Sequence, residues 1–245
     1  MIESVIYLLA IAGAEAVTVF FVSPWGLLCH IAVLTVVVVR SALGGAHFHH
    51  RLMLPIVLVP LLRIISLGVV ALDIPGIWLY PTIYASLLVA AVVVVRILGY
   101  STIDAGLNSK WLGIQLLVGG SGFVLGLGGY FILGTEPIVA RFVWQDIWLP
   151  ALILLLCTGF VEELVFRGLI QRGAVEVFGW WGIVYVSLLF AVLYMGFLSV
   201  VWVAFAFVIS LYFGWIAKKT GSIVGVVLAH GICNVALYLI VPFFF

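Results

Sequence analysis

Long apolar runs follow one another along almost the whole of this chain, and they restrict its fold more than any other feature. Hydrophobic residues make up 67% of the 245 positions and charged residues only 8%, and the mean hydropathy is +1.42. A soluble domain covers its core with charged side chains that make up roughly a quarter of the sequence. Most of this surface must therefore face lipid. Because the runs have helix length and do not alternate as strands, we expect an all-α polytopic bundle of transmembrane helices.

A window of about 20 residues predicts nine spans separated by turn-forming and charged residues. The predicted spans are 4–22, 25–40, 52–72, 77–96, 111–133, 147–168, 182–198, 200–217 and 223–243. The second span is short and the two that end at Ala217 are crowded, so a bundle of eight helices is an alternative. No soluble domain fits between the spans.

Basic residues fall almost entirely on one side of a nine-span bundle. Eight of them share one face: Arg40, Arg51, Arg96, Lys110, Arg167, Arg172, Lys218 and Lys219. Only Arg141 falls on the other face. Because short loops rich in Lys and Arg stay in the cytoplasm, we expect a cytoplasmic N-terminus and a C-terminus on the opposite side. The chain starts MIESVIYLL, with an acidic rather than a basic residue before the apolar run, so the first span is expected to be a retained anchor.

Several other features carry little functional information. The net charge of +1 offers no basic patch for nucleic acid. The cysteines Cys29, Cys157 and Cys233 are scattered within spans without a CxxC pair, and we interpret them as small apolar fillers. The stretch GGSGFVLGLGG places Gly122 and Gly126 one helical turn apart, which predicts close packing against a second helix.

The stretch VEELVFRG places charges at the end of an apolar run, where they are costly and by default indicate function. Glu163 and Arg167 are four residues apart with the acid first, the favourable order for an ion pair within a helix. Successive helical residues are separated by about 100 degrees, so Glu162 points elsewhere and is available as a base or a ligand. The alternative is a charged helix end that only marks the membrane boundary.

A second polar pair lies in the last span, in the stretch VVLAHGICNVALY. His230 and Asn234 are four residues apart and share one helix face. At 1.5 Å per residue, His230 lies about 10 Å from the cytoplasmic end of its span, a depth that Glu162 should share. A carboxylate, an imidazole and a carboxamide at one depth are suited to activating water and binding an oxyanion.

Two further charges lie within spans of the N-terminal half. Glu15 and Arg63 each stand about twelve residues into spans that enter from the same face, so they reach similar depths. We expect them to form an ion pair of about 4 Å inside the bundle. In the alternative arrangement, Arg63 lines a cavity and Glu15 has another partner.

The stretch EELVFRG, the segment that follows it, GWIAKKTGS and LAHGICN together resemble the CAAX protease and bacteriocin-processing (Abi) family of intramembrane endopeptidases. The resemblance covers roughly residues 147–240. It implies that Glu162 is the base, that Glu163 and Arg167 form a structural pair, and that His230 and Asn234 stabilise the oxyanion. It also implies that residues 147–245 are the catalytic core and that residues 1–146 supply the N-terminal helices of one membrane domain. The expected substrate is a peptide or membrane protein, lipidated ones included, that reaches a site open towards the cytoplasm; no metal or cofactor is expected.

The chain departs from this family at one motif. The family's FxxxH sequence falls on Phe190 to Tyr194, so a phenol stands where an imidazole is expected. A neutral tyrosine, with a pKa near 10, is a poor base near pH 7 but can position a water molecule. Tyr194 is therefore assigned to the site as a positioning group in an active enzyme, and it also supports an alternative in which the chain has lost hydrolysis and binds a membrane peptide or a regulatory partner.

The remaining histidines offer no clear replacement. His47, His49 and His50 lie in the first cytoplasmic loop without a nearby Cys or acid, which favours a partly protonated loop over a metal site. His30, within the second span, is a weak candidate for the same reason. A transporter is a third functional class, but we find no duplicated half and no matched pair of broken spans in the sequence.

Overall fold

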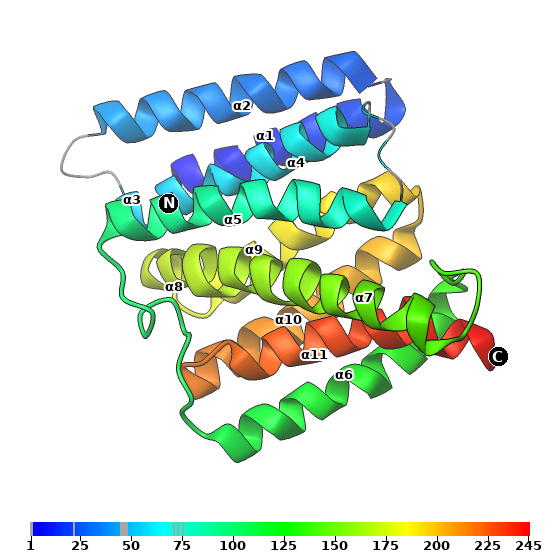
Figure 1. The fold of residues 1–245 in the computed structure, drawn as a ribbon. Coiled ribbons are helices and arrows are strands. Elements are labelled where there is room, and N and C mark those ends of the chain that lie inside the picture. Colours follow the sequence, from blue (N-terminus) through cyan, green and yellow to red (C-terminus); the bar gives the residue numbers. More distant parts are fainter. Residues whose placement is uncertain (1, 22, 45–48, 71, 73, 75) are drawn as a thin grey trace.

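The computed structural model describes residues 2–21, 23–44, 49–70, 72, 74 and 76–245, and every regular element in these ranges is a helix (Figure 1). The α-helices are α1 (Ile2–Phe20), α2 (Ser23–Leu43), α3 (His50–Ile56), α4 (Leu58–Val70), α5 (Leu79–Leu98), α6 (Leu112–Leu133), α7 (Trp144–Leu154), α8 (Gln171–Phe178), α9 (Trp181–Val192), α10 (Val200–Thr220) and α11 (Val224–Val235). Short 3₁₀ segments cover Gly76–Trp78, Leu193–Phe197 and Val241–Phe243. The predicted all-α fold is confirmed.

Eight helical stretches within the described ranges are long and apolar enough to cross a membrane, so the chain is an integral multi-pass membrane protein. The seventh predicted span, 182–198, coincides with a shorter apolar stretch, Trp181–Phe197. The second span is not the short one, since α2 has 21 residues. The third is divided into α3 and α4 next to Pro55, which lies inside α3.

Contacts between segments far apart in the sequence identify the residues that lie at each end of the bundle. At one end Arg172 donates to Asp104 (Nη2–Oδ1 3.0 Å), and the Asn108 side chain donates to the Gly221 carbonyl (2.8 Å). At the other end Arg141 pairs with Asp146, and the C-terminal Phe245 ring packs against Phe131. Figure 1 shows the two termini at opposite ends of the bundle. We call the end with Arg172 and Lys218 the basic end; that it faces the cytoplasm stays a prediction.

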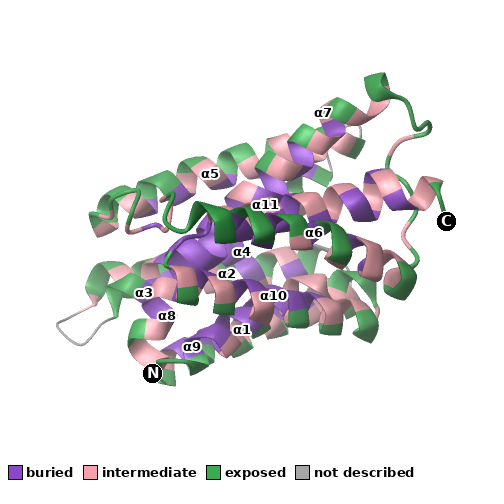
Figure 2. Cartoon of the chain, turned by 90° about the horizontal axis from the view of Figure 1, so that it is seen from below, coloured by how far each residue is buried: buried purple, intermediate pink, exposed green. Residues whose placement is uncertain are grey.

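The helix Trp144–Phe178 forms the centre of the bundle, with 67% of its most apolar window buried against 17% for α2 and for the stretch containing α5. Figure 2 shows the buried residues gathered inside, while exposed residues follow the outer sides of α5 and α6. Between α7 and α8 this helix widens into π-helical turns over Leu155–Glu162 and Leu164–Ile170. Such turns hold about one extra residue each and occur frequently at functional sites.

Helices α6 and α11 pack along the predicted glycine stripe. A Cβ added at Gly122 would lie 2.8 Å from the Ala229 Cα, closer than side chains pack. A Cβ at Gly126 would lie 2.5 Å from the Cys233 carbonyl oxygen of α11 and 2.6 Å from the Cβ of Ala236, the residue that follows α11. The absence of side chains at these positions therefore allows α11, which carries His230 and Asn234, to lie directly against α6.

We expect Gly122→Ala to destabilise the protein by about 1–3 kcal/mol, because the new methyl group must displace backbone of α11. The measurement is the thermal unfolding midpoint in detergent. Gly120→Ala is the matched control, since a Cβ there meets nothing within 4 Å. Equal midpoints for the two variants would show that α6 and α11 are not in close contact.

Candidate active site

Glu162 lies at the end of the first π-helical segment and faces a cavity of about 320 Å³ in the interior of the bundle. Its side chain is largely buried, with 8% of the residue exposed. The cavity is lined by residues of α4, α5, α7, α9 and α11, and its polar side chains are Arg63, Ser66, Tyr80, Tyr84, Thr158, Glu162, Tyr194, Asn234 and Tyr238. A carboxylate in such a chamber is able to bind and polarise a small polar molecule.

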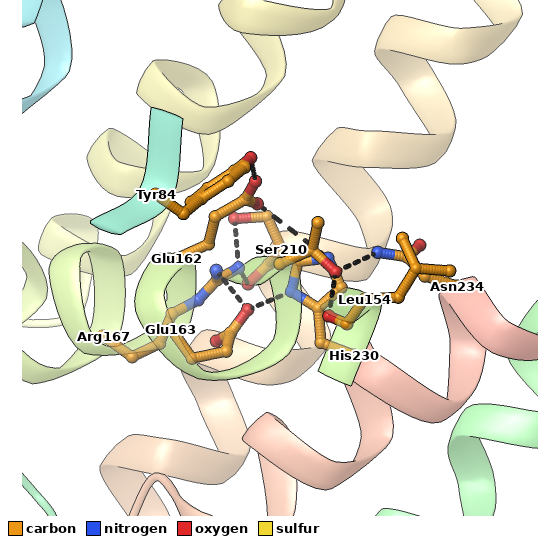
Figure 3. A network of polar contacts seen from close by, with 9 residues as sticks. Tyr84, Leu154, Glu162, Glu163, Arg167, Ser210, His230 and Asn234 are labelled. Atoms are coloured by element: carbon orange, nitrogen blue, oxygen red, sulfur yellow. Dashed lines mark hydrogen bonds and ion pairs between the residues drawn. The ribbon is translucent and has the colours of Figure 1, made fainter. Parts of the chain in front are cut away.

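Tyr84, on α5, donates a hydrogen bond from its hydroxyl to Glu162 Oε1 (Figure 3). Sequence reasoning missed this residue. A single tyrosine in an apolar span is common, and only the packing of α5 against the Leu155–Glu162 segment brings the hydroxyl to the carboxylate. No motif in the sequence could have indicated it.

Glu163 faces away from this contact and connects three elements. Its Oε1 accepts from Arg167 Nη1 at 2.8 Å and lies 2.7 Å from His230 Nδ1. Arg167 also donates from Nη2 to Ser210 Oγ at 2.8 Å, and its guanidinium lies over the Phe190 ring at 4.9 Å. The structure thus brings Glu163 and Arg167 together in a fully buried ion pair.

His230 is held between the two glutamates. Its Nδ1 is bonded to Glu163, and its Nε2 lies 3.9 Å from Glu162 Oε2 on the other side of the ring (Figure 3). Gly159 permits this approach, since a Cβ there would come 2.8 Å from the Val227 carbonyl oxygen of α11. The imidazole and the Glu162 carboxylate therefore face one another across a small gap.

Asn234 lies one turn further along α11, with its amide Nδ2 donating to Thr158 Oγ1 at 2.8 Å. Thr158 donates in turn to the Leu154 carbonyl at 2.6 Å. Asn234 lines the same cavity as Glu162. His230 lines a smaller adjoining cavity of about 30 Å³, which also contacts Tyr194 and Asn234.

Tyr194 lies in the 3₁₀ segment after α9 and lines both cavities. Its ring stacks on Phe197 and Trp202, with centroids 5.8 and 6.3 Å away. None of the described side chains forms a hydrogen bond with its hydroxyl, and in particular it does not bond Glu162. The structure thus places Tyr194 at the cavity wall and not on the carboxylate.

The lining of the main cavity extends well beyond Glu162. It includes Leu79, the first residue of α5, and Phe197, the last residue of the 3₁₀ segment after α9. That the site opens towards the cytoplasm stays a prediction.

Glu15 and Arg63 are in contact, as their depths suggested. Arg63 donates from Nη2 to Glu15 Oε2 at 2.9 Å and its Nε contacts Oε1. His30 joins them, with Nε2 3.3 Å from Glu15 Oε1, and both His30 and Glu15 are completely buried. Arg63 also lines the main cavity. It therefore forms the ion pair that we expected and also lies at a cavity, as the alternative arrangement proposed.

The histidine cluster of the first loop is only partly visible. His47 lies outside the described residues, and His49 and His50 are exposed at the start of α3. Among the residues that the structure describes, no three His, Cys, Asp or Glu side chains are arranged to hold a metal ion.

Comparison with known families connects this geometry to a class of proteins. Residues 144–236 match the family model described as type II CAAX prenyl endopeptidase Rce1-like. No curated protein and no solved structure shows significant similarity to the chain. The matched region contains Glu162, Glu163, Arg167, Tyr194, His230 and Asn234. The part of the chain that resembles the CAAX protease and bacteriocin-processing (Abi) family thus coincides with the region that this family model matches, which supports the resemblance.

Proposed function

We propose that this protein is an intramembrane endopeptidase in which Glu162 activates water for hydrolysis of a peptide bond. The observation that carries the proposal is the division of labour between two adjacent acids. Glu163 is occupied by Arg167 and His230, whereas Glu162 faces the cavity. A carboxylate beside an open chamber is suited to act as a general base.

The proposed reaction uses groups that line the main cavity and the smaller adjoining one. Glu162 accepts a proton from a water molecule as the water oxygen attacks the carbonyl carbon of the substrate, and the electron pair of the C=O bond moves to the oxygen. Asn234 and His230 stabilise the resulting oxyanion by hydrogen bonds. When the intermediate collapses, the C–N bond breaks and the proton on Glu162 passes to the leaving amine. The charges and atoms balance without a metal ion.

The substrates that we expect are peptides or membrane proteins, lipidated ones included, because the carboxylate lies within the membrane-spanning part of the bundle. We place the basic end in the cytoplasm, following the distribution of Lys and Arg. The catalytic core proposed for residues 147–245 then works together with the helices of residues 1–146, which supply one wall of the cavity.

One observation favours a second candidate, a relative that binds a membrane peptide without cleaving it. Tyr194 stands where the family has an imidazole. Its hydroxyl forms no hydrogen bond with Glu162 or with any other side chain that the structure describes. The substrate chamber would persist in such a protein, because it depends on the packing of five helices and not on one side chain.

The two candidates are separated by comparing the wild-type protein with Tyr194→His in liposomes that contain a mixed set of membrane and lipidated peptides. Products are identified by mass spectrometry. We expect the wild-type protein to cleave and Tyr194→His to change the rate by less than about tenfold, since no hydrogen bond joins the described Tyr194 and Glu162 side chains. Cleavage only by Tyr194→His would identify the wild-type chain as the binding relative, and no cleavage by either would refute the peptidase.

A further inference from the structure

A tyrosine contacts the proposed base Glu162, but this tyrosine is Tyr84 and not Tyr194, which occupies the histidine position of the family's FxxxH motif. We propose that Tyr84 is the positioning residue of this site, holding the Glu162 carboxylate in the orientation that hydrolysis requires. The inference rests on the proposed peptidase function. It assigns a role in the site to a residue of the N-terminal helices, outside the region 144–236 that matches the family.

The contact distinguishes the two oxygens of the carboxylate. Oε1 accepts the hydrogen bond from the Tyr84 hydroxyl, while Oε2 is turned toward His230 Nε2, 3.9 Å away. Hydrogen bonds to an ionised carboxylate are shorter and stronger than those between neutral groups. With one oxygen fixed in this way, the carboxylate cannot rotate freely, and Oε2 becomes the oxygen that accepts the proton of water.

The Tyr84 ring is itself held in place. It lies parallel to the Tyr80 ring, with centroids 6.4 Å apart and an interplanar angle of 9°, one turn earlier on α5. The helix α5 packs directly on the π-helical segment that ends at Glu162. The hydroxyl is therefore presented by a rigid element and not by a loop, as an orienting group requires.

Tyr194 is poorly placed for the same task. Its ring stacks on Phe197 and Trp202, and within the described part of the chain no hydrogen bond joins its hydroxyl to Glu162. A phenol near neutral pH is a donor and not a base. Tyr84 thus supplies the hydrogen bond that orients the carboxylate, and the base remains Glu162.

The first test is steady-state kinetics on a peptide that the wild-type protein cleaves. We expect Tyr84→Phe to lower kcat by about 10- to 100-fold, the value of one hydrogen bond to a charged group, and to leave KM within about twofold. Tyr130→Phe removes a hydroxyl on α6 outside both cavities, and its kcat should remain within about twofold of wild type. A Tyr84→Phe enzyme with unchanged kcat would overturn the proposal while leaving the peptidase function intact.

The second test does not depend on activity. A double-mutant cycle compares the thermal midpoints of Tyr84→Phe, Glu162→Ala and the double variant, because alanine leaves no side-chain oxygen for the Tyr84 hydroxyl to bond. If the hydroxyl holds the carboxylate, the two shifts should fail to add by at least about 2–4 °C, whereas Tyr130→Phe and Glu162→Ala should add. Additive shifts for Tyr84 and Glu162 would refute the contact, and with it the positioning role, even for a protein that cleaves. Absence of cleavage by the wild-type protein would instead refute the proposed function and the role in catalysis together.

Discussion

Glu162→Gln is expected to reduce peptide cleavage by about 10²- to 10⁴-fold, the contribution of a positioned general base. Glutamine keeps the size of the side chain and retains an oxygen that can accept the hydrogen bond from Tyr84. It cannot accept a proton from water near neutral pH. The loss should therefore appear in kcat, and substrate binding measured separately should change little. Initial rates in liposomes over a range of substrate concentrations provide the measurement.

The control for this variant is Glu136→Gln, which makes the same chemical change at an exposed position in the loop after α6. It should cleave at the wild-type rate. A Glu162→Gln protein that folds, binds peptide and cleaves within threefold of wild type would show that another group is the base. Glu163 would not be the next candidate, because it lines neither the main cavity nor the smaller adjoining one.

Arg167→Met is expected to destabilise the fold by about 3–5 kcal/mol, the range for a buried ion pair that loses one partner. Arg167 and Glu163 are both fully buried at the side chain, and the arginine also bonds Ser210. Without it, the Glu163 charge keeps only His230 as a partner. The thermal midpoint and the fraction of monodisperse protein in detergent are the measurements.

Two comparisons make this result specific. Arg172→Met removes an arginine five positions further along the same helix. In its ion pair with Asp104 each side chain is about two-fifths exposed, so the loss of folding stability should stay below about 1 kcal/mol. The double variant Glu163→Leu/Arg167→Met should be more stable than Arg167→Met alone, since no unpaired charge remains. A single Arg167→Met variant as stable as Arg172→Met would contradict the buried pair.

Much of this architecture could be predicted from local sequence. Apolar runs of helix length identified the all-α bundle because lipid forces every span to satisfy its own backbone. The spacing of Glu163 and Arg167 is a property of a single helix, and their contact at 2.8 Å needs no information from the rest of the fold. The motifs of residues 147–240 resemble a family whose model also matches residues 144–236.

The parts that could not be predicted depend on contacts between distant helices. Tyr84 is separated from Glu162 by 78 positions, and nothing in its own helix distinguishes it from Tyr80. The bond between His230 and Glu163 spans 67 positions and uses the ring nitrogen opposite to the one that faces Glu162. The span 25–40 was predicted to be the short one, but α2 has 21 residues and the shorter apolar stretch is Trp181–Phe197. Hydropathy measures how apolar a stretch is and not where its helical hydrogen bonds end.

The π-helical turns before Glu162 have a consequence for the comparison of related sequences. Each such turn contains about one residue more than an α-helical turn, so it can be gained or lost by a single insertion or deletion without disturbing the helix on either side. A relative that forms an ordinary α-helix here would have fewer residues between Pro150 and the paired glutamates. Its correct alignment to this chain would then need a gap inside an uninterrupted transmembrane helix, a place where alignment procedures usually penalise gaps. Sequence comparisons that forbid such a gap would pair Glu162 with the wrong residue or miss the relationship between the chains.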